Sequence, residues 1–317
     1  MSKKSNNQGR GYEYVWIKIL EEHLQKICRI KVIKNSSFDV NKNAFETLSD
    51  EQKKIYKISA ESAIETIFEL EPRICEISDD ELTLKFQKDE VAIKGDVRDI
   101  VISRKDFEIG LSIKHNHDAV KHSRLSKKID FGFEWFESPC SENYWQKVTP
   151  IFDRLKILKE KNLNWSEVED KNNSVYVPIL QAFMDEIKKS CANDKNIPRK
   201  IVEYLIGVKD YYKIISRDSK RLTIIETFNL RGTLNKPSEK IISAITVPKI
   251  SLPTELVAIK FKNTSKNTVE MYLNNGWQIN FRIHNASTKV EPSLKFDIKF
   301  IGMPPEILCI KCIWKSE

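Results

Sequence analysis

Residues 95–114 read Gly-Asp-Val-Arg-Asp-Ile-Val-Ile-Ser-Arg-Lys-Asp-Phe-Glu-Ile-Gly-Leu-Ser-Ile-Lys, and this stretch decides the fold that we expect. A short apolar run at 100–102 and an alternating apolar run at 109–113 are typical of two β-strands. The residues at 104–107 lie between these runs and suit a tight turn. The stretch therefore predicts a β-hairpin.

The register of this hairpin brings an acid and a lysine together. Pairing around the turn places Ile102 opposite Ile109, and it places Asp99 opposite Ser112. Lys114 follows Ser112 by two residues, so the alternation of a strand puts both side chains on the same face. An aspartate can hold a divalent metal ion, and a lysine can act on a water molecule. Asp99 and Lys114 therefore predict a hydrolytic centre at one end of the hairpin.

This arrangement resembles the active site of the PD-(D/E)xK nucleases. Asp99 corresponds to the metal-binding acid, and Ser112-Ile113-Lys114 stands in place of the (D/E)xK triplet. The candidate catalytic residues are thus Asp99, Ser112 and Lys114. Asp99 would bind Mg²⁺ with the backbone carbonyl of Ile113, and Lys114 would orient the attacking water or stabilise charge on the phosphate. Because position 112 holds a serine, a second metal-binding acid must come from elsewhere.

The second acid can be sought among the neighbouring carboxylates. Glu108 is six residues from Lys114 along one strand, which is about 20 Å, so it cannot share the metal. Asp96 lies just ahead of the first strand. Glu65 or Glu61 could reach the hairpin from a preceding helix, although a solvated helix face explains each of them equally well. We expect Glu65 first and Asp96 second.

Longer segments resemble the HaeIII-type family of Type II restriction endonucleases. The matching segments are Ser5–Arg10, Asp96–Asp99, Ser112–Asn116, Lys121–Ser126 and Asn275–Ala286. The resemblance implies Mg²⁺-dependent cleavage of double-stranded DNA in the centre of GGCC, and a companion DNA methyltransferase that protects the host. A palindromic target favours a homodimer. The alternative, which Ser112 leaves open, is a DNA- or RNA-binding protein without catalysis on a nuclease-like fold.

Two further groups of residues have the chemistry to bind DNA. Hydroxyl and basic side chains follow the hairpin and suit phosphate contacts; they are Lys121, Ser123, Arg124 and Ser126. Near the C-terminus a strand alternates apolar residues with amides, an arginine and a histidine, which can read base edges. The proposed reading residues are Gln278, Asn280, Arg282, His284 and Asn285. Arg282 is the candidate for a guanine contact, and a plain amphipathic strand is the alternative.

Composition agrees with a soluble nucleic-acid enzyme. The 317 residues are 40% hydrophobic and 31% charged, with a net charge of +8. Residues 50–90 hold 12 acids and 6 bases, so this segment carries −6 and the rest of the chain +14. A basic body around an acidic segment suits a polyanion and a metal pocket, although ordinary surface charge explains the distribution almost as well. Six scattered cysteines and the lack of a long apolar run predict a reduced, cytoplasmic protein without a membrane span.

A helix followed by several strands is the order of the nuclease core in the family that the chain resembles. The resemblance therefore implies an α/β (α+β) fold with a PD-(D/E)xK-like core of helix plus mixed sheet. Residues 1–150 would hold N-terminal helices and the nuclease core, 151–240 a helical middle region, and 241–317 a β-rich DNA-recognition region. A helix is expected at 49–70, where Ser49 and Gln52 form a capping pair and Pro72 follows. Residues 117–128 are expected to be helical or rich in turns.

Overall fold

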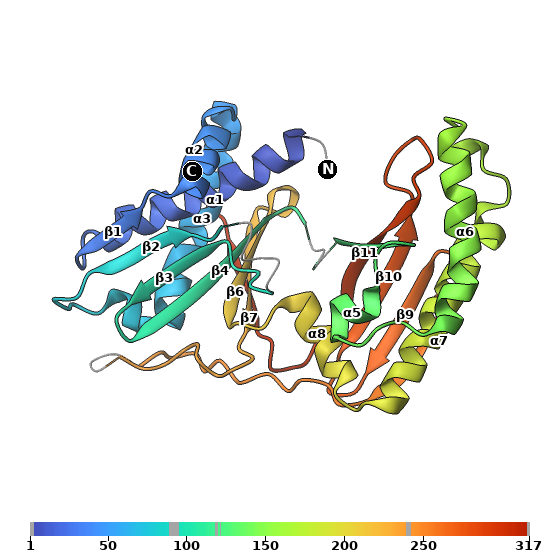
Figure 1. Cartoon of the computed structure of the whole chain (residues 1–317). Coiled ribbons are helices and arrows are strands. Elements are labelled where there is room, and N and C mark those ends of the chain that lie inside the picture. The colour runs from blue at the N-terminus through green and yellow to red at the C-terminus, as the bar shows by residue number, and fades with distance from the viewer. Residues whose placement is uncertain (1–2, 89–94, 118–119, 121, 239–241, 316–317) are drawn as a thin grey trace. The chain divides into compact units, whose positions relative to one another are not determined.

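The chain is described by a computed structural model at residues 3–88, 95–117, 120, 122–238 and 242–315. Unit 1 comprises Met1–Asp118, Val208–Ser251 and Pro305–Glu317, and unit 2 comprises Ala119–Gly207 and Leu252–Pro304. Each unit is built from segments that are distant in sequence, whereas the expected boundaries near 150 and 240 divide the chain linearly. Each unit contains helices and one sheet (Figure 1), which confirms the predicted α+β class.

Unit 1 is built on a mixed sheet of seven strands, here called sheet A, in the order β1-β2-β3-β4-β6-β7-β12. Its strands are β1 (Ile30–Ile33), β2 (Leu82–Phe86), β3 (Ile100–Arg104), β4 (Phe107–His115), β6 (Tyr211–Arg217), β7 (Leu222–Phe228) and β12 (Cys309–Ile313). The β1–β2 and β4–β6 pairs are parallel and the others are antiparallel. The predicted hairpin, β3–β4, lies in the interior of this sheet.

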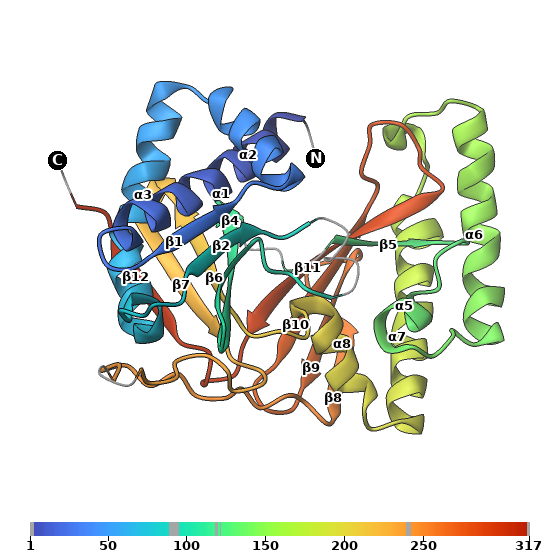
Figure 2. The ribbon, with the colours of Figure 1, turned by 60° about the vertical axis from the view of Figure 1, so that its left-hand side comes forward.

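Three helices pack against sheet A: α1 (Lys3–Leu24), α2 (Ser36–Glu46) and α3 (Asp50–Leu70). Figure 2 shows α1 and α3 beside the strands. The helix expected at 49–70 is confirmed, because the Ser49 side chain accepts from the Gln52 backbone and the Gln52 side chain accepts from the Ser49 backbone. Helices and strands share one apolar core, in which Trp16, Ile67 and Leu111 are fully buried.

Unit 2 is built on an antiparallel sheet of five strands, here called sheet B, in the order β5-β11-β10-β9-β8. Its strands are β5 (His122–Ser126), β8 (Leu256–Phe261), β9 (Thr268–Leu273), β10 (Gln278–His284) and β11 (Ser293–Gly302). Its helices include α5 (Phe131–Phe136), α6 (Glu142–Glu160), α7 (Val177–Asn193) and α8 (Ile197–Ile206). Trp135 of α5 and Phe183 of α7 pack on Phe281 of β10, with ring centroids 5.8 and 5.5 Å apart, so these helices cover one face of sheet B.

One expected element is wrong. The sequence predicts a helix or turns at 117–128, but residues 122–126 form strand β5 at the edge of sheet B. The pairing of Leu125 with Leu294 of β11 supplies the reason, because contact with a neighbouring strand outweighs local preference. No helix among the described residues has the length and apolar character needed to cross a membrane.

Candidate active site

The β3–β4 hairpin has the predicted register. Ile102 pairs with Ile109, and Arg104 pairs with Phe107 at the turn. The Asp99 backbone N–H donates to the Leu111 carbonyl at 2.8 Å, which extends the pairing one residue beyond β3. The local alternation of apolar residues thus brings Asp99 to the end of β4.

Asp99 and Lys114 lie together at this end. Three donors converge on Oδ2 of Asp99: the Ile113 backbone N–H at 2.6 Å, Lys114 Nζ at 2.9 Å and Ser112 Oγ at 3.3 Å. The Asp99 and Lys114 side chains keep 22% and 31% of their exposure, so solvent can reach both. All three donors come from β4, and they orient the carboxylate through a single oxygen.

Glu13 of α1, which the sequence analysis did not predict, lies near enough to interact electrostatically with Asp99 and Lys114. Burial, together with repulsion from Asp99, raises the pKa of Glu13 to about 8, although Lys114 and Asn41 oppose the rise. Asn41 of α2 donates to Glu13 Oε2 at 2.8 Å. A signal was present: Glu13 begins an i, i+4, i+7 series with Ile17 and Leu20, both fully buried, so an acid stands on the apolar side of its helix.

The acids expected from sequence have other surroundings. Glu65 is exposed on α3, and Glu61 contacts His23 at 2.9 Å. Asp96 is buried and receives two hydrogen bonds from the Arg98 guanidinium, at 2.7 and 2.6 Å. Burial opposes the charge of Asp96, but Arg98 outweighs burial and lowers its pKa. Asp96 therefore forms an ion pair that holds Arg98.

The surroundings of Lys114 favour its charged, protonated form. Burial disfavours the ammonium, but Asp99 and Glu13 outweigh burial and raise the pKa of Lys114 above its usual value. On the adjacent strand β6, Lys213 pairs in register with Ser112 and lies 3.5 Å from Glu226. Burial lowers the pKa of Lys213 despite Glu226, and Lys114 adds to this effect. Lys114 is thus a hydrogen-bond donor in this arrangement, which suits the stabilisation of negative charge.

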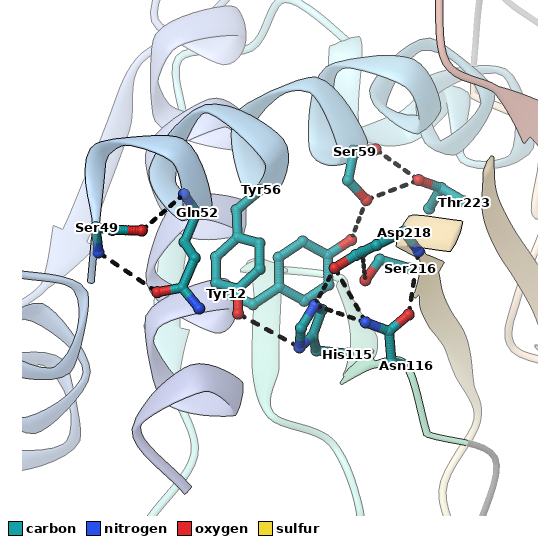
Figure 3. A network of polar contacts seen from close by, with 10 residues as sticks. All are labelled: Tyr12, Ser49, Gln52, Tyr56, Ser59, His115, Asn116, Ser216, Asp218 and Thr223. Atoms are coloured by element: carbon teal, nitrogen blue, oxygen red, sulfur yellow. Dashed lines mark hydrogen bonds and ion pairs between the residues drawn. The ribbon is translucent and has the colours of Figure 1, made fainter. Parts of the chain in front are cut away.

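A polar network fixes the residues next to this centre (Figure 3). His115, which follows Lys114, contacts Asp218 at 2.7 Å and the Tyr56 hydroxyl at 3.3 Å. Tyr12, which precedes Glu13, contacts the Ser59 hydroxyl at 2.7 Å. The network therefore anchors the neighbours of both Lys114 and Glu13 to α3.

The residues expected to bind phosphates differ in exposure. Ser123 and Ser126 are buried, at 6% and 7% exposure, which leaves them little surface for a phosphate contact. Arg124 is exposed and donates to Ser293 Oγ at 2.9 Å. Lys121 lies outside the described residues. Of the described members of this set, only Arg124 is exposed.

The expected reading strand is β10, and its faces alternate as predicted. Ile279, Phe281 and Ile283 are fully buried, whereas the residues between them are exposed or partly exposed: Gln278, Asn280, Arg282 and His284. Arg282 Nη2 donates to Asp297 of β11 at 2.7 Å. Asn285 follows the strand, and its amide binds the Lys289 carbonyl at 2.7 Å, which holds the loop.

The carboxylates suit a hard divalent cation. No group of three or more His, Cys, Asp and Glu residues that could hold a metal occurs in the part of the chain that the structure describes. Asp99 and Glu13 are close enough to repel each other, and Mg²⁺ takes one or two protein carboxylates, with phosphate oxygens and water completing its shell. The residues present therefore fit Mg²⁺.

Comparisons with known proteins agree over the length of the chain. The family described as HaeIII restriction endonuclease matches residues 9–304. The Type II restriction enzyme HaeIII of Haemophilus aegyptius is 51% identical over 319 residues, covering 100% of both chains. No solved structure matches.

Proposed function

The chain belongs to the HaeIII restriction endonuclease family, and from that premise we propose that it hydrolyses both strands of duplex DNA at a short palindromic site with Mg²⁺. It is an enzyme, a Type II site-specific deoxyribonuclease. The observation that carries the proposal is the contact between Asp99 and Lys114 at one end of the hairpin, with Glu13 near enough to interact electrostatically with both.

Asp99 and Glu13 would hold the metal. Mg²⁺, when bound, supplies Lewis-acid polarisation of the phosphate and a more acidic water. Ser112 and the Ile113 backbone orient Asp99 through Oδ2, and Asn41 orients Glu13. Ser112 thus takes a supporting part in the place where the (D/E)xK pattern has an acid, and α1 provides the second carboxylate.

Lys114 would act on the phosphate. Its raised pKa keeps the ammonium protonated near neutral pH, so Lys114 donates hydrogen bonds and does not accept a proton. A donor held at the reacting end of β4 can stabilise the charge that develops on the pentavalent phosphate. It can also orient the attacking water through one N–H.

The remaining parts of the proposal concern DNA. The family resemblance implies GGCC, cut in its centre, and a companion methyltransferase that protects the host in the cytoplasm. Arg282 would contact guanine, with Gln278, Asn280 and His284 reading other base edges, and Arg124 would contact a phosphate. A palindromic site favours a homodimer, because a two-fold protein matches a two-fold target.

One experiment tests the function. The purified protein is incubated with plasmid DNA and Mg²⁺, and the ends of the products are sequenced. Discrete fragments that share one end sequence support the proposal, and GGCC halves at those ends support the target. Intact DNA that is nevertheless shifted in a gel would overturn the proposal in favour of a binding protein without catalysis.

A further inference from the structure

Charged side chains cluster on the face of sheet B opposite α5 and α7. This polar face carries the side chains that β10 turns away from Phe281, and those of its register partners on β9 and β11. Its cations include Lys260, Arg282, Lys295 and Lys299, and its acids include Glu270 and Asp297. The excess of positive charge among them suits duplex DNA.

Asp297 lies at the centre of the cations. Its Oδ2 accepts a hydrogen bond from Arg282 Nη2 at 2.7 Å and lies 3.2 Å from His284 Nε2. Its Oδ1 lies 3.7 Å from Lys295 Nζ. Asp297 keeps 19% of its side-chain exposure, whereas Arg282 keeps 57%. One half-buried carboxylate therefore holds an exposed arginine.

We propose that Asp297 is a positioning residue for base recognition, which rests on the proposed function. The contact occupies one N–H of Nη2, and an arginine has five N–H donors in a planar fork. The other donors of the fork can still form a bidentate contact with guanine. Fixing the fork before binding reduces the entropy lost on recognition.

The direction in which removal of the Asp297 carboxylate changes DNA affinity distinguishes a positioning role from plain surface charge. A carboxylate on a DNA-facing surface repels phosphates of every sequence, so its removal should strengthen non-specific binding. If Asp297 also orients Arg282, its removal should weaken binding to the cognate site. The two affinities then change in opposite directions.

The test compares Asp297→Asn with Glu270→Gln on short duplexes without metal. One duplex contains the site found by end sequencing, and the other has that site scrambled. Glu270 is the matched control, because it is an acid of the same face that pairs in register with Asn280 and accepts from the Tyr272 hydroxyl. We expect Asp297→Asn to lower the ratio of cognate to scrambled affinity by roughly 5- to 150-fold, and Glu270→Gln to leave the ratio unchanged.

A double mutant shows whether Asp297 acts through Arg282. With Arg282→Ala already present, Asp297→Asn should lower the ratio no further. An unchanged ratio in Asp297→Asn, or a fully additive loss in the double mutant, would overturn the positioning role while the endonuclease activity stands. A parent protein that binds both duplexes alike would overturn the recognition face as well, and thermal unfolding of each variant verifies its fold.

Discussion

Replacing Glu13 by Gln should stabilise the metal-free protein while removing its ability to cut. The pKa of Glu13 rises from 4.5 to about 8 in the folded chain, so the fold favours the protonated acid. Below about pH 4.5 Glu13 is protonated in both the folded and the unfolded chain, so it does not lower the free energy of unfolding. As pH rises towards 8, the unfolded chain ionises first, and the free energy of unfolding falls.

The magnitude follows from that rise. At about 1.4 kcal/mol for each pKa unit, it corresponds to about 5 kcal/mol above pH 8. Glu13 keeps part of its exposure, which reduces the effect to about 2–4 kcal/mol. Glutamine can still accept from Asn41, so the hydrogen bond at 2.8 Å need not be lost.

Urea unfolding in the presence of a chelator measures the effect at about pH 5 and about pH 9. Glu13→Gln should gain stability over the parent at the higher pH and little at the lower pH. Glu65→Gln is the matched control, because Glu65 is exposed on α3, and it should change neither stability nor cutting. Equal stability of Glu13→Gln and the parent at both pH values would refute the reasoning.

Three other predictions concern the site and the DNA. Asp99→Ala and Lys114→Ala should each abolish cutting in a plasmid assay while specific binding of DNA is retained. Glu108→Gln is the control and should cut normally, because the Glu108 carboxylate pairs with Arg98. A Lys114→Ala variant with about a tenth of the parent rate or more would contradict the assignment of Lys114. Arg124→Ala should weaken binding to all duplexes and reduce the salt slope by about 1, measured by titration at several salt concentrations. Mg²⁺ affinity should rise between about pH 6 and about pH 9, because binding displaces the proton of Glu13; calorimetry that shows a flat profile would exclude Glu13 as a ligand.

The parts of the molecule that sequence predicted are those that depend on local patterns. The alternation around residues 104–107 determined which residue faces which, so the sequence alone places Asp99 and Lys114 together, as the structure confirms. The cap at Ser49 located the start of α3 in the same way. The period of apolar residues and helix capping both depend on residues a few positions apart, so they can be recognised in a single sequence.

Contacts between distant segments could not be predicted. Glu13 and Asp99 are separated along the chain by β1, α2, α3 and β2, and only the packing of α1 brings them together. Asp297 likewise meets Arg282 through the β10–β11 register. In each case the local sequence around one residue contains no information about its distant partner. Helix glutamates such as Glu65 were therefore equally good candidates for the second metal-binding acid.

Because position 112 is a serine, the proposed second metal-binding carboxylate comes from helix α1 and not from strand β4. A strand acid two residues before Lys114 would be set by the pleat of β4 alone, but Glu13 comes from a helix, so its distance from Asp99 depends on how α1 packs. Tyr12, the preceding residue, is tied to Ser59 of α3, and Ser59 contacts Thr223 of β7 at 2.8 Å. The geometry of the proposed metal site therefore depends on the hydrogen bonds between helices and sheet, and damage to that network should affect catalysis before it affects DNA binding.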